Sequence, residues 1–221
     1  MNLIFYNNWH NGDVHFTREF IKDIILKTNF NEYFYLQNNS YKLLKDIDIL
    51  KKGKTNKFCS DNNIILQINN DIYVNTWIGV GYYLEDIGVP NLKSYYTLFE
   101  HIYKKLNIKL ENINNYIPEI DYNYFDIKEI DNFISNNNRN KILIDNVEGN
   151  SYQSKKIDFD SIIKEIIVSF PDFDFILTNS QNKLLFDNVF YTNDIIKTEN
   201  GDLNEISFLS TFCKIIIGRS S

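Results

Sequence analysis

Cysteine, proline and glycine are scarce in this chain of 221 residues, which holds two, three and eight of them respectively. The two cysteines, Cys59 and Cys213, lie far apart and offer neither a disulfide framework nor metal-ligand spacing, so we expect a reducing compartment. The low glycine and proline content excludes collagen-like and loop-only architectures. Hydrophobic residues make up 43% of the chain, which is enough for the core of one large domain or two small ones.

Excess positive charge and long apolar runs are also lacking. The formal net charge of −6 excludes broad binding to a nucleic-acid backbone, although a local basic pocket for a phosphorylated small molecule is compatible with it. No apolar run approaches the roughly 20 residues of a membrane helix. The segment 1–13 lacks the basic and apolar regions of a signal peptide. We therefore expect a cytoplasmic protein, and peripheral contact with a membrane stays open.

Short apolar runs alternate with amphipathic segments along the chain. The continuous runs favour parallel strands covered on both faces, and their alternation with helices predicts an α/β fold. The expected strands are 2–6, 32–37, 63–68, 71–79, 141–146, 173–179, 188–192 and 214–218. One helix is expected to begin at Val14, and further helices are expected at 94–108, 125–138, 158–170 and 202–213.

The pattern restarts after the helix at 125–138, so we predict two domains, 1–130 and 131–221. Each begins with an apolar strand, a polar loop that contains glycine, and an amphipathic helix. Ligands of open α/β sheets bind outside the carboxyl ends of the strands. The two polar loops are therefore the candidate sites, and they would face each other if both strand ends point to a common cleft.

The order of these elements and the residues at both ends resemble the GT-B glycosyltransferases of the heptosyltransferase type. Gly12-Asp13-Val14-His15 looks like the Gly-Asp turn of that family, and DLNEISFLSTFCKIIIGRSS, residues 202–221, is similar to the end of its nucleotide-sugar-binding domain. The resemblance implies two Rossmann-like domains, an acceptor-side domain 1–130 and a nucleotide-sugar-binding domain 131–221. Family members continue past this last strand, so the resemblance also implies an incomplete second domain.

The resemblance implies metal-independent, inverting transfer of a sugar from a nucleotide-diphosphate sugar to a glycan or glycolipid acceptor, with no cofactor. The two DxD sequences at 46–48 and 172–174 do not stand convincingly after a strand, which agrees with the absence of a metal. The family carries an acid where Ser220 stands, which weakens a donor-site role there.

In the first domain such a transfer needs a base for the acceptor hydroxyl. Asp13 is the candidate, because Gly12 removes bulk beside it and the turn presents it at a strand's carboxyl end. An N-cap of the following helix is the equally weighted alternative for Asp13. His10 and His15 are further candidates for a base or donor, because imidazole titrates near neutrality. Arg18, one turn into the helix, is expected to be solvated, and phosphate binding is the alternative.

In the second domain the departing diphosphate needs hydrogen-bond donors and positive charge. The loop after strand 141–146 and the last residues of the chain supply them, although an ordinary connection is as good an explanation for any one residue. The loop lacks the GxGxxG and GxxxxGK[ST] patterns of dinucleotide and ATP sites. The candidates are Asn146, Glu148, Gly149, Asn150, Ser151, Lys155, Glu205, Gly218, Arg219, Ser220 and Ser221. Glu205 either completes a capping box with Asp202 or contacts the ribose.

Two other classes of function fit the same pattern. One is a non-catalytic nucleotide- or sugar-binding module, and the other is an enzyme similar to the sugar-nucleotide epimerases. Fold-level likeness does not separate these from a glycosyltransferase.

Overall fold

The computed structural model describes residues 1–8, 11–36, 40–80, 91–146, 159–178, 183–196 and 203–218. The chain divides into two compact units, Met1–Asp121 and Tyr122–Ser221. The division precedes the predicted boundary at 130/131, so the helix expected as a connection belongs wholly to the second unit. The α/β class predicted from the sequence is confirmed in both units.

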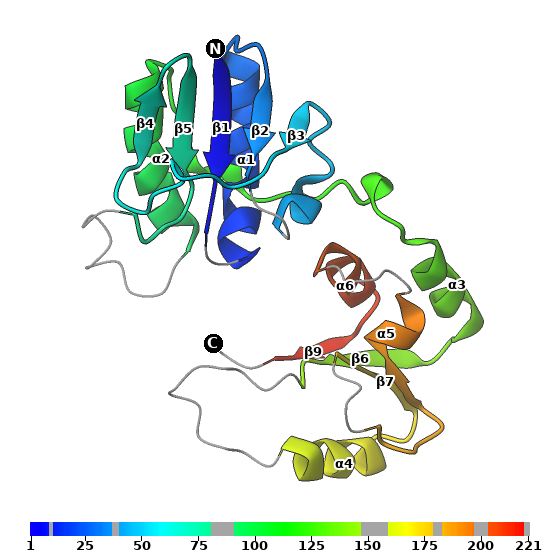
Figure 1. Cartoon of the computed structure of the whole chain (residues 1–221). Coiled ribbons are helices and arrows are strands. Elements are labelled where there is room, and N and C mark those ends of the chain that lie inside the picture. Colours follow the sequence, from blue (N-terminus) through cyan, green and yellow to red (C-terminus); the bar gives the residue numbers. More distant parts are fainter. Residues whose placement is uncertain are drawn as a thin grey trace. The chain divides into compact units, whose positions relative to one another are not determined.

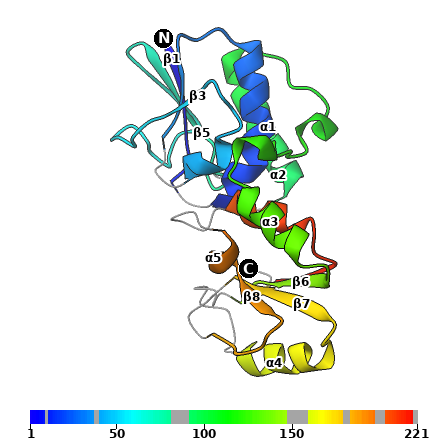
Figure 2. The same ribbon diagram turned by 90° about the vertical axis from the view of Figure 1, so that its right-hand side faces the viewer.

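The first unit is a five-stranded sheet with helices on one face (Figures 1 and 2). The strand order is β3-β2-β1-β5-β4; only β4 is antiparallel to its neighbour. The elements are β1 (Asn2–Tyr6), α1 (Asn11–Lys27), β2 (Tyr33–Tyr35), η1 (Ser40–Leu44), β3 (Leu50–Lys52), β4 (Ile65–Ile68), β5 (Asp71–Asn75), α2 (Leu92–Leu106) and η3 (Ile113–Tyr116).

Both faces of β1 are buried, because side chains alternate across a strand. Leu3 and Phe5 join the large core beneath α1 and α2. Ile4 and Tyr6 face the other way, into a smaller cluster that includes Phe58 from the loop before β4. This loop covers the second face where a fully doubly wound sheet would carry helices.

The second unit is a four-stranded, fully parallel sheet in the order β8-β7-β6-β9, covered on both faces. Its elements are η4 (Tyr122–Tyr124), α3 (Lys128–Asn136), β6 (Asn140–Ile144), α4 (Phe159–Ser169), β7 (Phe173–Leu177), β8 (Val189–Tyr191), α5 (Thr192–Ile195), α6 (Leu203–Ser210) and β9 (Ile215–Ile217). In Figures 1 and 2, α4 lies on one side of this sheet and α3, α5 and α6 on the other.

The two sheets share one feature of strand order. If only the parallel strands of each sheet are numbered in chain order, both sheets run 3-2-1-4 from one edge to the other. The order therefore reverses between β1 and β5 in the first sheet and between β6 and β9 in the second. Ligands of open α/β sheets bind beside such reversals, outside the carboxyl ends of the strands.

Among the helices that the structure describes, none is long and apolar enough to cross a bilayer.

Candidate functional site

The carboxyl edge of the first sheet, where β1 and β5 end side by side, carries a buried polar cluster. The register pairs Tyr6 with Asn75, so both chains leave the sheet at the same level. Thr76 continues from β5 and donates its backbone N–H to the carbonyl of Tyr6 at 2.8 Å. Asn75 and Thr76 are both fully buried. Buried polar groups at a strand reversal make this edge the first candidate site.

Asp13 lies in this cluster, inside the first turn of α1. The helix begins at Asn11, so the prediction that Asp13 caps a helix starting at Val14 is wrong. The Asp13 side chain is only 5% exposed, and its Oδ1 accepts a hydrogen bond from the Tyr95 hydroxyl. Its Oδ2 is buried and has no hydrogen-bond partner among the residues described. The helix N-terminus favours the negative charge, but burial leaves one carboxylate oxygen unsatisfied.

Two buried tyrosines lie near the carboxylate. The Tyr95 ring stacks on Phe16 with a centroid distance of 5.1 Å. The Tyr35 hydroxyl lies 3.4 Å from Thr76 Oγ1, which donates to the Tyr6 carbonyl at 3.1 Å. Burial is the main cause that raises the pKa of Tyr95 and of Tyr35, and the charge of Asp13 raises both further. Both phenols therefore stay protonated at neutral pH and can act as donors.

The other candidate residues near Asp13 in the sequence are Gly12, His15 and His10. A Cβ added to Gly12 would meet nothing within 4 Å, so the structure gives no steric reason for glycine there. His15 is half-buried, and burial, followed by the Arg18 charge, lowers its pKa below the usual 6.5. A neutral imidazole can accept a proton, so His15 stays a candidate base. His10 lies outside the described residues.

The expectation that Arg18 is solvated is wrong, because its side chain is fully buried. Its guanidinium bonds the Asp46 carboxylate and the Leu43 carbonyl. Asp46 Oδ2 in turn accepts the backbone N–H of Asp121 at 3.3 Å. The Arg18–Asp46 pair thus fastens η1 and the end of the first unit to α1, and it is not available for a phosphate.

The carboxyl edge of the second sheet carries hydroxyl and amide groups. Thr178, after β7, donates to Asp145 Oδ1 at 2.8 Å and accepts the Asn146 N–H at 3.2 Å. Thr192, after β8, donates to the Thr178 carbonyl at 3.3 Å. The Asp145 N–H bonds the Ile217 carbonyl of β9 at 2.8 Å. The ends of all four strands are therefore tied together by polar groups.

This arrangement brings two predicted donor-site residues to one place. Ile144 pairs with Ile217 in the register of β6 and β9, so Asn146 and Gly218 follow neighbouring strands at the strand reversal. Glu205 is 1% exposed in the first turn of α6, so its side chain lies in the interior of the second unit. The other donor-site candidates lie outside the described residues: Glu148, Gly149, Asn150, Ser151, Lys155, Arg219, Ser220 and Ser221.

The described residues give little support for a metal site or a reactive thiol. These hold no group of three or more His, Cys, Asp or Glu side chains that could bind a metal ion. Of the two DxD sequences, Asp46 is paired with Arg18, and Asp174 is buried within β7. Burial raises the pKa of the Cys59 thiol, and that of Cys213 to about 11, so neither is a ready thiolate.

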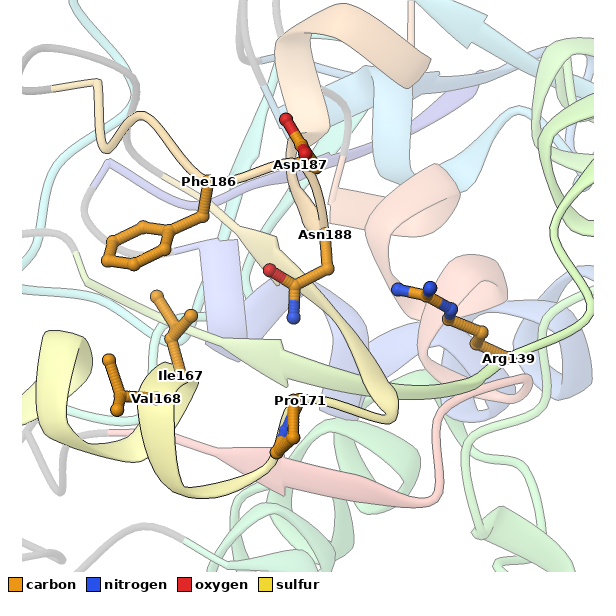
Figure 3. Close-up of a pocket in the computed structure, with 7 residues that line it drawn as sticks. All are labelled: Arg139, Ile167, Val168, Pro171, Phe186, Asp187 and Asn188. Carbon is orange, nitrogen blue, oxygen red and sulfur yellow. The ribbon is translucent and has the colours of Figure 1, made fainter.

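A shallow hollow of about 400 Å³ lies at the opposite, amino edge of the second sheet (Figure 3). Its residues precede β6, β7 and β8 in the chain or end α4. They are Arg139, Ile167, Val168, Pro171, Phe186, Asp187 and Asn188. Arg139 also lies 3.8 Å from the buried Asp174 carboxylate. This hollow is away from the edge where α/β sheets bind ligands.

Sequence reasoning missed the residues that surround Asp13. On the helix predicted at 94–108, the structure buries Tyr95 and Leu98 and leaves Tyr96 and Leu106 only partly buried. Tyr95, Leu98 and Ile102 recur at helical spacing, so the periodicity held the signal. Nothing local marked Thr178, whose partners come from another strand.

Comparisons of the chain with protein-family models, curated proteins and solved structures give no match.

Proposed function

We propose that the chain is a metal-independent, inverting glycosyltransferase with a GT-B-like pair of Rossmann-like domains. It moves a sugar from a nucleotide-diphosphate sugar to a glycan or glycolipid acceptor in the biosynthesis of cell-surface glycans. Asp13 is the general base, and the carboxyl edge of the second sheet holds the nucleoside diphosphate. A cytoplasmic location with peripheral membrane contact belongs to the same proposal.

The observation that carries the proposal is the state of the Asp13 carboxylate. One oxygen is held by Tyr95, and the other is buried without a partner in the described part of the chain, beside the reversal of strand order. A buried, unsatisfied carboxylate oxygen costs stability, and such groups persist where a function uses them. Proton abstraction from a hydroxyl is a use that fits a carboxylate.

In the proposed reaction a proton passes to Asp13, and a new bond to the anomeric carbon replaces the bond to the diphosphate. Asp13 Oδ2 takes the proton of the acceptor hydroxyl while the acceptor oxygen bonds to the anomeric carbon of the sugar. The bond from that carbon to the diphosphate oxygen breaks, and the nucleoside diphosphate leaves with the electron pair. Backbone N–H groups and hydroxyls near Asn146, Thr178 and Gly218 stabilise this leaving group.

Titration of the ¹⁵N-labelled chain with UDP, GDP and ADP tests the donor site. We expect amide shifts at Asn146, Thr178 and Gly218 in the presence of at least one of them. Inorganic pyrophosphate is the control, because it separates binding of the nucleoside from binding of phosphate alone. Shifts confined to residues 1–125 contradict the assignment of the donor to the second unit.

A non-catalytic nucleotide- or sugar-binding module is the second candidate. The 5% exposure of Asp13 favours it, because a base must reach its substrate. The two candidates differ in turnover: a binding module shows the same amide shifts but releases no nucleoside diphosphate from a nucleotide sugar.

A further inference from the structure

Tyr95 holds Asp13 from the neighbouring helix of the first unit. Its hydroxyl donates to Asp13 Oδ1, which joins the start of α2 to the first turn of α1. The Tyr95 side chain is 1% exposed, and its ring stacks on Phe16 at an interplanar angle of 11°. Burial and the stacking on Phe16 thus hold the ring and its hydroxyl in place, and the hydroxyl in turn holds the carboxylate.

A second carboxylate of α1 shows what a purely structural bond of this kind looks like. Asp23 Oδ2 accepts from Tyr103 at 2.7 Å and from Tyr116 at 3.0 Å, and it pairs with Lys27 at 2.9 Å. Asp23 is partly exposed and has a cation that balances its charge. Asp13 is more deeply buried, has a single tyrosine donor, and has no cation paired with it among the described residues.

The single donor makes the two oxygens of Asp13 unequal. Oδ1 accepts the Tyr95 hydroxyl, whereas Oδ2 keeps its lone pairs for another donor. A carboxylate held at one oxygen cannot turn freely, so the direction in which Oδ2 presents its lone pairs is fixed. Preorganisation of this kind keeps a base within reach of its proton.

We propose that Tyr95 is a positioning residue for the transfer reaction, which binds Oδ1 of Asp13 and so presents Oδ2 to the acceptor hydroxyl. The inference rests on the proposed function, because it assigns Tyr95 a role only if Asp13 is the base.

The test compares Tyr95→Phe with Tyr96→Phe in the full chain. Tyr96 is the matched control, because its hydroxyl donates to the Glu111 carbonyl at 2.7 Å and its ring also packs on the core. The probe is a panel of UDP-, GDP- and ADP-sugars, and the readout is release of nucleoside diphosphate. A hydrogen bond to a charged group corresponds to roughly a 10- to 100-fold effect, so we expect Tyr95→Phe to lower kcat by that factor with KM unchanged. Tyr96→Phe should keep the wild-type kcat.

The pH profile separates positioning from mere packing. Loss of a donor to the charged carboxylate disfavours ionisation, so the acid limb of the kcat profile should move to higher pH in Tyr95→Phe alone. The charge of Asp13 acts on two titratable groups, Tyr95 on α2 and Tyr35 on β2. His15 and Arg18 lie further along α1 itself. The tyrosines stay protonated across the range measured.

A proton NMR signature checks the bond without turnover. A buried hydroxyl proton bonded to a carboxylate should resonate downfield, vanish in Tyr95→Phe, persist in Tyr96→Phe and move upfield in Asp13→Asn. Its absence from the wild-type spectrum overturns the inference.

The outcomes distinguish the two claims. No turnover of the panel by the wild-type chain, or wild-type turnover by Asp13→Asn, contradicts the proposed function and the inference with it. Loss of turnover in Asp13→Asn together with equal kcat and equal pH profiles for the two tyrosine variants contradicts the role of Tyr95 alone.

Discussion

The carboxyl edges of the two sheets share a strand order but differ in their chemistry. The edge of the first unit is closed around a charged group, with Asp13 buried against Tyr95 and beside Tyr35. The edge of the second unit is a half-buried network around the Thr178 hydroxyl, which links the Asp145 carboxylate to backbone and side-chain groups at the ends of the neighbouring strands. Equivalent positions in two similar sheets thus suit two different tasks.

The difference extends to what each unit buries. The first unit encloses a complete ion pair, Arg18–Asp46, and the second leaves Arg139 more than half exposed beside Asp174. Burying charge costs free energy that a small domain regains only through well-placed partners. The buried pair of the first unit therefore holds both of its charged side chains in fixed positions, whereas in the second unit the exposed Arg139 holds the buried Asp174 less tightly.

The largest expected effect comes from breaking the buried pair. Arg18→Met leaves the buried Asp46 carboxylate with only the partly exposed Lys22 at 3.7 Å as a cation among the described residues, so we expect a loss of about 3 kcal/mol in the free energy of unfolding. Arg139→Met also takes a partner from a buried carboxylate, Asp174, but Arg139 is itself 58% exposed and 3.8 Å away, so we expect a smaller loss. Urea denaturation measures both.

The double variant Arg18→Met with Asp46→Leu sharpens the same comparison. It removes both charges, so it should recover much of the lost stability. A double variant as unstable as Arg18→Met alone would show that the packing of Arg18, and not its charge, matters.

Two glycines of the first unit should respond in opposite ways. A Cβ on Gly79 would lie 2.3 Å from the Trp77 ring, so Gly79→Ala should destabilise the unit by about 1–3 kcal/mol. Gly12→Ala meets open space within a helix and should stabilise by up to about 1 kcal/mol. Thermal unfolding compares them, and a destabilised Gly12→Ala would restore the steric role expected from the sequence.

Thr178→Val tests the network of the second unit. It removes one hydroxyl that serves Asp145 and Asn146, at a cost of about 1–2 kcal/mol. Thr211→Val is the control, because among the described residues the Thr211 hydroxyl bonds only the Phe208 carbonyl, at an exposed helix end. Equal stability of the two variants would show that the edge network does not hold the strand ends together.

The smallest effect concerns pH. Burial lowers the pKa of His15 in the folded state below 6.5, so the unfolded chain binds the proton more readily. The contribution of His15 to stability is therefore complete above pH 6.5 and is lost as the pH falls below that value. His15→Gln should flatten the dependence of stability on pH on this acid side, and an unchanged dependence would place the effect elsewhere.

The strands were predictable because they are continuous apolar runs, as in NLIFY and KILI, which form β1 and most of β6. The strand Leu50–Lys52 was missed, since a short edge strand with two exposed lysines carries no apolar pattern. Asp13 could be chosen from its place after β1, but its burial depends on a helix far along the chain. Arg18 was expected to be solvated because its partner Asp46 is distant in sequence. Asp46 follows η1, a short 3-10 helix that the hydrophobic periodicity does not predict.

Turnover by Asp13→Asn tests the central claim most directly. Asparagine keeps the size of the side chain and an oxygen for the Tyr95 hydroxyl, but it cannot take a proton from an acceptor. With a nucleotide-diphosphate sugar that the wild-type chain turns over, and an equal melting temperature, we expect the rate to fall 10²- to 10⁴-fold. A folded Asp13→Asn chain that releases nucleoside diphosphate at the wild-type rate would contradict the account.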